Sequence, residues 1–101
     1  MKAKTFYEYS YPENDDSWED LGKLVVEFDE SEAYEQNATK LFKKGTKYTL
    51  LASDGCSCWD GNWEGWTEVT KTELKKLGEA WSKDYSRAEK NIGEWIVENV
   101  E

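Results

Sequence analysis

The sequence predicts a single α+β domain in which a small three-stranded sheet is packed on one face by two or three helices. Three observations predict this class. Short segments in the first half alternate apolar and polar residues, and apolar residues recur at helical spacing after residue 66. The chain has 101 residues, which is the usual size of one domain, so we expect one core across residues 1–101. The expected element order is β-β-α-β-loop-α-α.

Two strands are expected near the N-terminus. Residues 5–11 place three tyrosines on one face and mostly polar residues on the other, which is the period-2 pattern of a strand. A proline followed by Asn and Asp residues then favours a turn, and the alternation resumes over residues 23–28. We expect these two strands to pair as a hairpin.

A first helix is expected over residues 30–44. Asp29 and Glu32 have the spacing of a capping box, and the apolar residues that follow recur every three or four positions. Two lysines suit the C-terminal end of the helix dipole, and Gly45 can adopt the left-handed conformation that ends a helix. A third strand is predicted over residues 46–53, where apolar and polar residues alternate again.

Two consecutive helices, or one kinked helix, are expected to close the chain. Thr70 and Glu73 form a capping box that predicts the start of a helix. Ser86 and Glu89 repeat this spacing ahead of a second stripe of apolar residues. A glycine and two adjacent β-branched residues weaken helix propensity near the end, so residues 95–100 are alternatively a short strand.

Charge and composition exclude several classes of partner. Thirteen basic and 22 acidic residues give a net charge of -9, which disfavours direct binding to nucleic acid or to an anionic membrane. We therefore expect a protein partner that is basic or neutral. The sequence has no apolar run of the ~18 residues that span a bilayer, and residues 1–11 lack the pattern of a secretory signal. A cytoplasmic location is expected.

The most unusual segment is residues 54–66, which is rich in Trp, Gly and Cys. Two Asp-Gly pairs predict tight turns, so we expect a compact loop after the third strand. Its three tryptophans either complete a core that is short of aliphatic residues or form an exposed surface, since Trp is common at interface hot spots. The exposed alternative predicts a partner-binding set that comprises Trp59, Asp60, Trp63, Glu64 and Trp66.

Cys56 and Cys58 give a second hypothesis, a metal- or redox-responsive module. Structural zinc takes four ligands, usually Cys or His, and this chain has two cysteines and no histidine. A metal site would need carboxylates or a second subunit, and a Cys-x-Cys disulfide would close a small, easily reduced ring. Free structural thiols are the favoured interpretation, and we expect no cofactor.

Catalysis is not expected. Without histidine the common Ser/His and Cys/His schemes are missing, and no phosphate-binding or dinucleotide-binding glycine motif occurs. The acidic run within residues 13–20 gives a third hypothesis, a mimic of nucleic-acid phosphates. Lysines interrupt the acidic faces farther along the chain, which favours an ordinary solvated loop instead.

The Gly-Cys-Ser-Cys-Trp segment at residues 55–59 resembles a loop of small uncharacterised proteins encoded by bacteriophages and prophages. The similarity covers about a tenth of the chain and implies a viral protein in a host cytoplasm. Such proteins have no assigned activity, so the resemblance implies no catalytic or binding residue. Together with the composition, it leads us to expect a non-enzymatic acidic protein that binds or inhibits a host protein through the aromatic loop.

Overall fold

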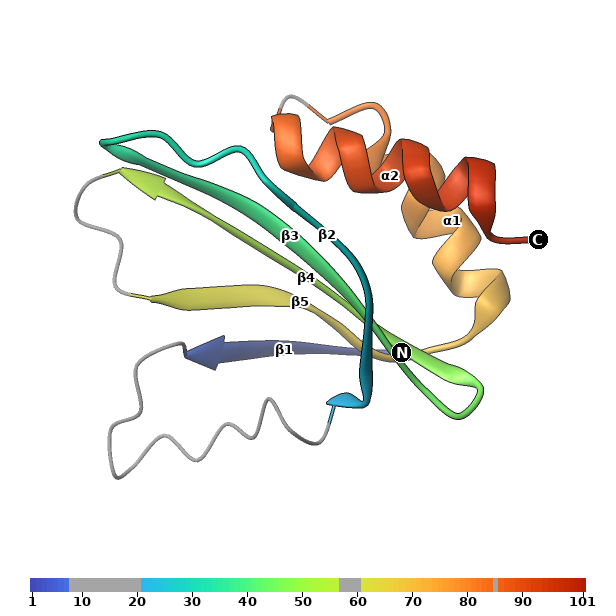
Figure 1. The fold of residues 1–101 in the computed structure, drawn as a ribbon. Helices are drawn as coiled ribbons and strands as arrows, with labels where there is room; N and C mark the ends of the chain where they lie inside the picture. Colours follow the sequence, from blue (N-terminus) through green and yellow to red (C-terminus); the bar gives the residue numbers. More distant parts are fainter. Residues whose placement is uncertain (8–20, 57–60, 85) are drawn as a thin grey trace.

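The computed structural model describes residues 1–7, 21–56, 61–84 and 86–101. These residues form a five-stranded antiparallel sheet followed by two helices (Figure 1). The strands are β1 (Lys2–Tyr7), β2 (Lys23–Asp29), β3 (Glu35–Lys44), β4 (Lys47–Cys56) and β5 (Asn62–Val69). The helices are α1 (Lys71–Trp81) and α2 (Arg87–Asn99).

The strand order across the sheet is β1-β5-β4-β3-β2. Strands β2 to β5 therefore form a meander, and β1 is added beside β5. The α+β class is as predicted, but the three-stranded sheet and the order β-β-α-β-loop-α-α are wrong. The expected hairpin of the first two strands is also wrong, because β1 and β2 lie at opposite edges of the sheet. Residues 8–11 of the first predicted strand lie outside the described residues.

The predicted helix over residues 30–44 is wrong because β3 occupies most of that segment. Ala38, Leu41 and Phe42 are buried at spacings of three and four residues, which also describes the apolar face of a helix. In β3 this spacing arises because both faces are buried, with Leu41 on the helix side and the other two on the opposite side. Gly45, which suggested a helix end, instead forms the β3–β4 turn with a φ of 63°.

A hydrophobic cluster lies on each face of the sheet. The helices cover one face, where apolar residues of the sheet and of both helices form the helix-side core. Its fully buried members are Leu41, Leu50, Val69, Leu74, Ile92 and Ile96. The cluster on the opposite face comprises Phe6, Leu21, Ala38, Phe42, Leu51 and Trp63. Neighbouring residues of one strand therefore belong to different clusters, because successive side chains of a strand point to opposite faces of the sheet.

Both helices begin at the predicted caps. The Thr70 hydroxyl accepts the Glu73 N–H at 3.2 Å, and the Glu73 carboxylate accepts the Thr70 N–H at 3.0 Å, which completes the predicted capping box. Helix α2 continues to Asn99, so the alternative of a strand over residues 95–100 is wrong. Gly93 is kept in this helix because a Cβ there would collide with the backbone at the end of α1.

Trp63 is the largest of the fully buried side chains, and 2% of its surface is exposed. The Trp63→Ala variant should lose about 3–5 kcal/mol of stability, because it removes a large apolar contact and leaves a cavity. Tyr34→Ala is the matched aromatic control, since Tyr34 is 81% exposed, and it should change stability by no more than about 0.5 kcal/mol. Urea denaturation measures both, and a wild-type midpoint for Trp63→Ala would contradict the assignment of this residue to the core.

Candidate functional site

The predicted compact loop over residues 54–66 consists mostly of strand residues. Its first residues end β4 and its last residues belong to β5, while Trp59 and Asp60 lie outside the described residues. Trp63 is buried in the cluster opposite the helices, whereas Trp66 is partly buried against the helix-side core. Glu64 is exposed. Trp63 therefore fits the core alternative, and the partner-binding role of the other four residues stays a prediction.

Cys56 is disulfide-bonded, and none of the described cysteines is free. The expectation of a free thiol is therefore wrong for Cys56, and Cys58 lies outside the described residues. Within the described ranges, no three His, Cys, Asp or Glu side chains are grouped so that they could hold a metal ion. The hypothesis of a metal module gains no ligand set from these residues.

A depression of about 590 Å³ lies beside the helices on the same face of the sheet. The helices contact mainly β2, β3 and β4, so the region of this face formed by β1 and β5 is less covered. We call this hollow the acidic depression. Three carboxylates line it from different elements, together with one tryptophan from β5 and one from α1. Its defining residues are Asp54, Glu64, Trp66, Trp81 and Glu89.

Strand register explains why the sheet is hollow at this point. Thr5 and Ala52 lie on either side of Glu64, and Ala3 is the β1 partner of Trp66. These three neighbours have short side chains, so they leave space above the sheet between the larger groups. The acidic depression is therefore a product of strand pairing between segments that are far apart in the sequence.

The first turn of α2 is fixed to the sheet by Asn37, a buried residue of β3. The Asn37 Oδ1 accepts the backbone N–H of Ala88 at 2.8 Å and the Ser86 hydroxyl at 3.2 Å. Beside it, the hydroxyl of Thr39 donates to the carbonyl of Ala88 at 3.0 Å. The bond from Ala88 satisfies a backbone N–H that has no partner within the helix, because the first N–H groups of a helix lack one. The bonds to Ser86 and Thr39 add further contacts between β3 and the start of α2. They also fix the position of Glu89, the residue after Ala88, relative to the sheet.

The predicted second capping box forms only partially. The Ser86 hydroxyl accepts the Glu89 N–H at 3.5 Å, as predicted. The N–H of Ser86, however, donates to Asp84 Oδ1 at 2.8 Å rather than to Glu89. Since Asp84 takes this role, the Glu89 carboxyl is left to line the acidic depression.

Glu89 is the most perturbed acid among the described residues for which a pKa shift is resolved. Partial burial raises the pKa of Glu89 to about 7, and a hydrogen bond with Asp84 and the negative charges of Asp84 and Asp54 add to the shift. Each cause disfavours the ionised carboxylate. A cation bound in the depression would act in the opposite direction and would stabilise the ionised form.

A second hollow of about 790 Å³ adjoins the first and shares Asp54 with it. Acidic residues of the β2–β3 connection line this hollow. The guanidinium of Arg87, from α2, pairs with two of them: its Nη2 lies 4.0 Å from Glu30 Oε2, and its Nη1 lies 3.6 Å from Glu32 Oε1. Tyr34, which is largely exposed, is at its rim. The positive end of the α2 dipole partly offsets this negative charge. Carboxylates thus surround the start of α2 on two sides.

Comparison with known proteins gives no relative for this chain: no family model, curated protein or solved structure matches it. The resemblance of residues 55–59 to phage-encoded proteins stays a prediction. Neither α1 nor α2 is long and apolar enough to cross a membrane, and the described residues contain no other α-helix. The geometry of the site is therefore the basis for any functional proposal.

The sequence placed Glu64 and Trp66 in the predicted partner-binding set, and Asp54 only at the start of the same segment. It did not connect them with Glu89 or Trp81, because only strand register and the fixed start of α2 bring these residues together. The signal that could have found Glu89 was the incomplete second cap. An aspartate two residues before Ser86 competes for the backbone group that Glu89 would otherwise accept.

Asn37→Ala should destabilise the fold by about 2–3 kcal/mol, because it removes several hydrogen bonds and leaves buried polar groups of α2 without partners. Asn91→Ala is the matched control. Asn91 is half-buried and donates one side-chain hydrogen bond, to Glu30 at 2.9 Å, so its loss should cost about 1 kcal/mol or less. Thermal or urea unfolding measures both variants. Equal losses would show that Asn37 has no special role at the start of α2.

Glu89→Gln should change the pH dependence of stability. Because the folded-state pKa is raised, the folded chain binds more protons than the unfolded chain between pH 4.5 and about 7, and stability falls as the pH rises through that window. The variant should be more stable than the wild type at pH 8 by about 1 kcal/mol, after discounting for solvent screening, and equal to it at pH 4. Urea midpoints at both values measure this. A variant less stable than the wild type at pH 8 would contradict the assigned environment of Glu89.

Proposed function

We propose that this chain is a non-enzymatic binding protein that holds a basic segment of a protein partner in the acidic depression. The observation that carries the proposal is the convergence of three carboxylates and two tryptophans in one hollow. Among the described residues that line it, the one cation is Lys4, and its ammonium lies 4.6 Å from the ring centroid of Phe6. Since Phe6 belongs to the cluster on the opposite face, the carboxylates face the hollow without that charge.

An arginine side chain matches this combination of groups best. Its guanidinium is planar and always charged, it stacks on aromatic rings, and it binds a carboxylate through two parallel hydrogen bonds. Trp66 and Trp81 offer ring surface, and Asp54, Glu64 and Glu89 offer acceptors. Burial is the main cause of the raised pKa of Glu89, and a bound guanidinium would offset the repulsion from Asp84 and Asp54 that adds to it.

The neighbouring hollow extends the surface open to such a segment. It shares Asp54 with the acidic depression and adds Glu30, Glu32, Glu35 and Asp84. Arg87 lies beside Glu30 and Glu32, but among the described residues of this hollow the five carboxylates outnumber this one cation, so a second basic residue would still meet net negative charge. Opposite charge across an interface speeds association and excludes acidic competitors. The resemblance to phage-encoded proteins makes a host protein the partner class that we propose.

The alternative of a phosphate mimic has no structural observation behind it, because the acidic run at residues 13–20 lies outside the described residues.

Titration with the peptide acetyl-Gly-Arg-Ala-Arg-Gly-amide tests the proposal, with tryptophan fluorescence and backbone amide shifts as readouts. The Asp54→Asn/Glu64→Gln double variant should weaken binding about tenfold, because it removes two charges from the hollow. The matched control is Glu94→Gln/Glu98→Gln. Both control residues are exposed on α2 and line neither acidic hollow, so binding should weaken less than about twofold.

Two results would contradict the proposal. An equal loss in both double variants would mean that the peptide responds only to net charge. Saturable binding of the corresponding glutamate peptide, with the same amide shifts, would mean that the hollow does not select for positive charge. Binding that persists in high salt, by contrast, would point to the two tryptophans as its main source, since exposed charge pairs are screened.

A further inference from the structure

A third hollow, of different chemistry, lies near the C-terminal end of α2. It has a volume of about 330 Å³, and its lining includes apolar and aromatic side chains from β2, β4 and α2 and the residue after it. We call it the apolar hollow and define it by Val25, Tyr48, Trp95 and Val100, with Lys43 and Lys71 beside them. Since α2 has 13 residues and rises about 1.5 Å per residue, about 20 Å of helix separates its two ends. This site is therefore distinct from the acidic depression, which adjoins the first turn of α2.

A β-bulge leaves apolar surface exposed at this point. The pairing of β2 with β3 shifts register between Leu24 and Val26, so Val25 is the extra residue. Val25 is 40% exposed and Leu24 is 39% exposed. Trp95 is partly buried against the helix-side core and also lines the hollow. The exposed apolar surface is thus continuous with the core beneath it.

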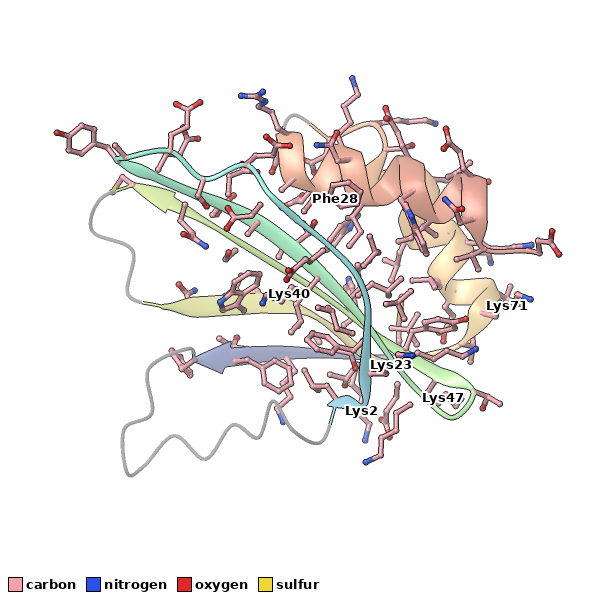
Figure 2. The ribbon with its side chains drawn as sticks, in the orientation of Figure 1. Lys2, Lys23, Phe28, Lys40, Lys47 and Lys71 are labelled. Atoms are coloured by element: carbon pink, nitrogen blue, oxygen red, sulfur yellow. The ribbon has the colours of Figure 1, made fainter. Side chains whose placement is uncertain are left out.

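The lysines here are placed against two local electrostatic preferences. Lys23 and Lys43 are direct partners across β2 and β3, and like charges in such a pair destabilise a sheet. Lys71 is the first residue of α1, at the positive end of the helix dipole, where acids are preferred. Figure 2 shows Lys23 and Lys71 toward the end of the molecule where β3 turns into β4. Within the chain, the Lys43 ammonium lies 5.4 Å from the ring centroid of Tyr48. An anionic partner would in addition offset the repulsion between Lys23 and Lys43.

We infer that the apolar hollow is a docking site for an acidic protein segment that carries one large apolar side chain. The apolar side chain would occupy the space between Val25, Tyr48 and Trp95, and its flanking carboxylates would pair with Lys43 and Lys71. A volume of about 330 Å³ is at the lower end of the range for ligand sites, about 300–1,000 Å³, which suits a single side chain. Among the described residues that line this hollow, the one acid is Glu101, so the charge complementarity selects an acidic segment.

The test uses the peptide acetyl-Glu-Asp-Phe-Asp-Glu-amide and isotope-labelled protein. Peptide binding should shift the indole resonance of Trp95 and the backbone amide of Val25. The Lys43→Gln/Lys71→Gln variant should raise the dissociation constant about fivefold. Its matched control is Lys75→Gln/Lys76→Gln, which removes two exposed lysines of α1 that do not line the hollow and should have less than about a twofold effect.

Replacing the phenylalanine of the peptide with alanine tests whether the site requires an apolar side chain. The alanine peptide should bind the wild-type protein more weakly than the phenylalanine peptide does. Equal affinity of the two peptides, equal losses in the two lysine variants, or shifts confined to other regions of the chain would each overturn the inference. The variant Val25→Asp gives an independent check, because it places a negative charge at the mouth of the hollow and should weaken binding without changing any lysine. Wild-type affinity in that variant would also overturn the inference.

Discussion

The contact between Asn37 and the first turn of α2 is the constraint on which the functional surface depends. A strand residue here does what a capping side chain normally does from within the helix, because it accepts the N–H of Ala88 in a buried setting. Buried polar groups are costly unless they are paired, so few other placements of α2 satisfy them. The helix start, and with it the carboxyl of Glu89, is therefore fixed relative to β3 and β4.

Helix α2 connects two surfaces of opposite chemistry. Carboxylates gather around its first turn in two adjoining hollows, where the positive end of the helix dipole reduces their repulsion. Lysines and exposed apolar residues gather near its last turn. A net charge of -9 describes the chain as a whole but conceals this division. The acidic and apolar surfaces lead us to propose basic and acidic protein segments, respectively, as their occupants.

Local signals in the sequence predicted the two helices after residue 70 well, but they predicted the sheet poorly and placed a helix where β3 lies. The capping box at Thr70 and Glu73 depends on residues three apart, so it can be recognised without knowledge of the fold. In β3, by contrast, Leu41 and Phe42 are buried on opposite faces, and the resulting pattern imitates a helix. The acidic depression was not predictable, because strand register and the Asn37 contact bring its residues together. The sequence pattern around Trp63 was consistent with either a core or a surface position, and the burial of its side chain in the structure shows that it is a core residue.

Amide hydrogen exchange at Ala88 tests the central claim most directly. The first N–H groups of a helix lack partners within the helix, so they normally exchange rapidly. If Asn37 accepts the Ala88 N–H inside the fold, this amide should exchange about as slowly as that of Leu50 in the centre of the sheet. Exchange of the Ala88 amide as rapid as that of a solvent-exposed turn residue would contradict the account.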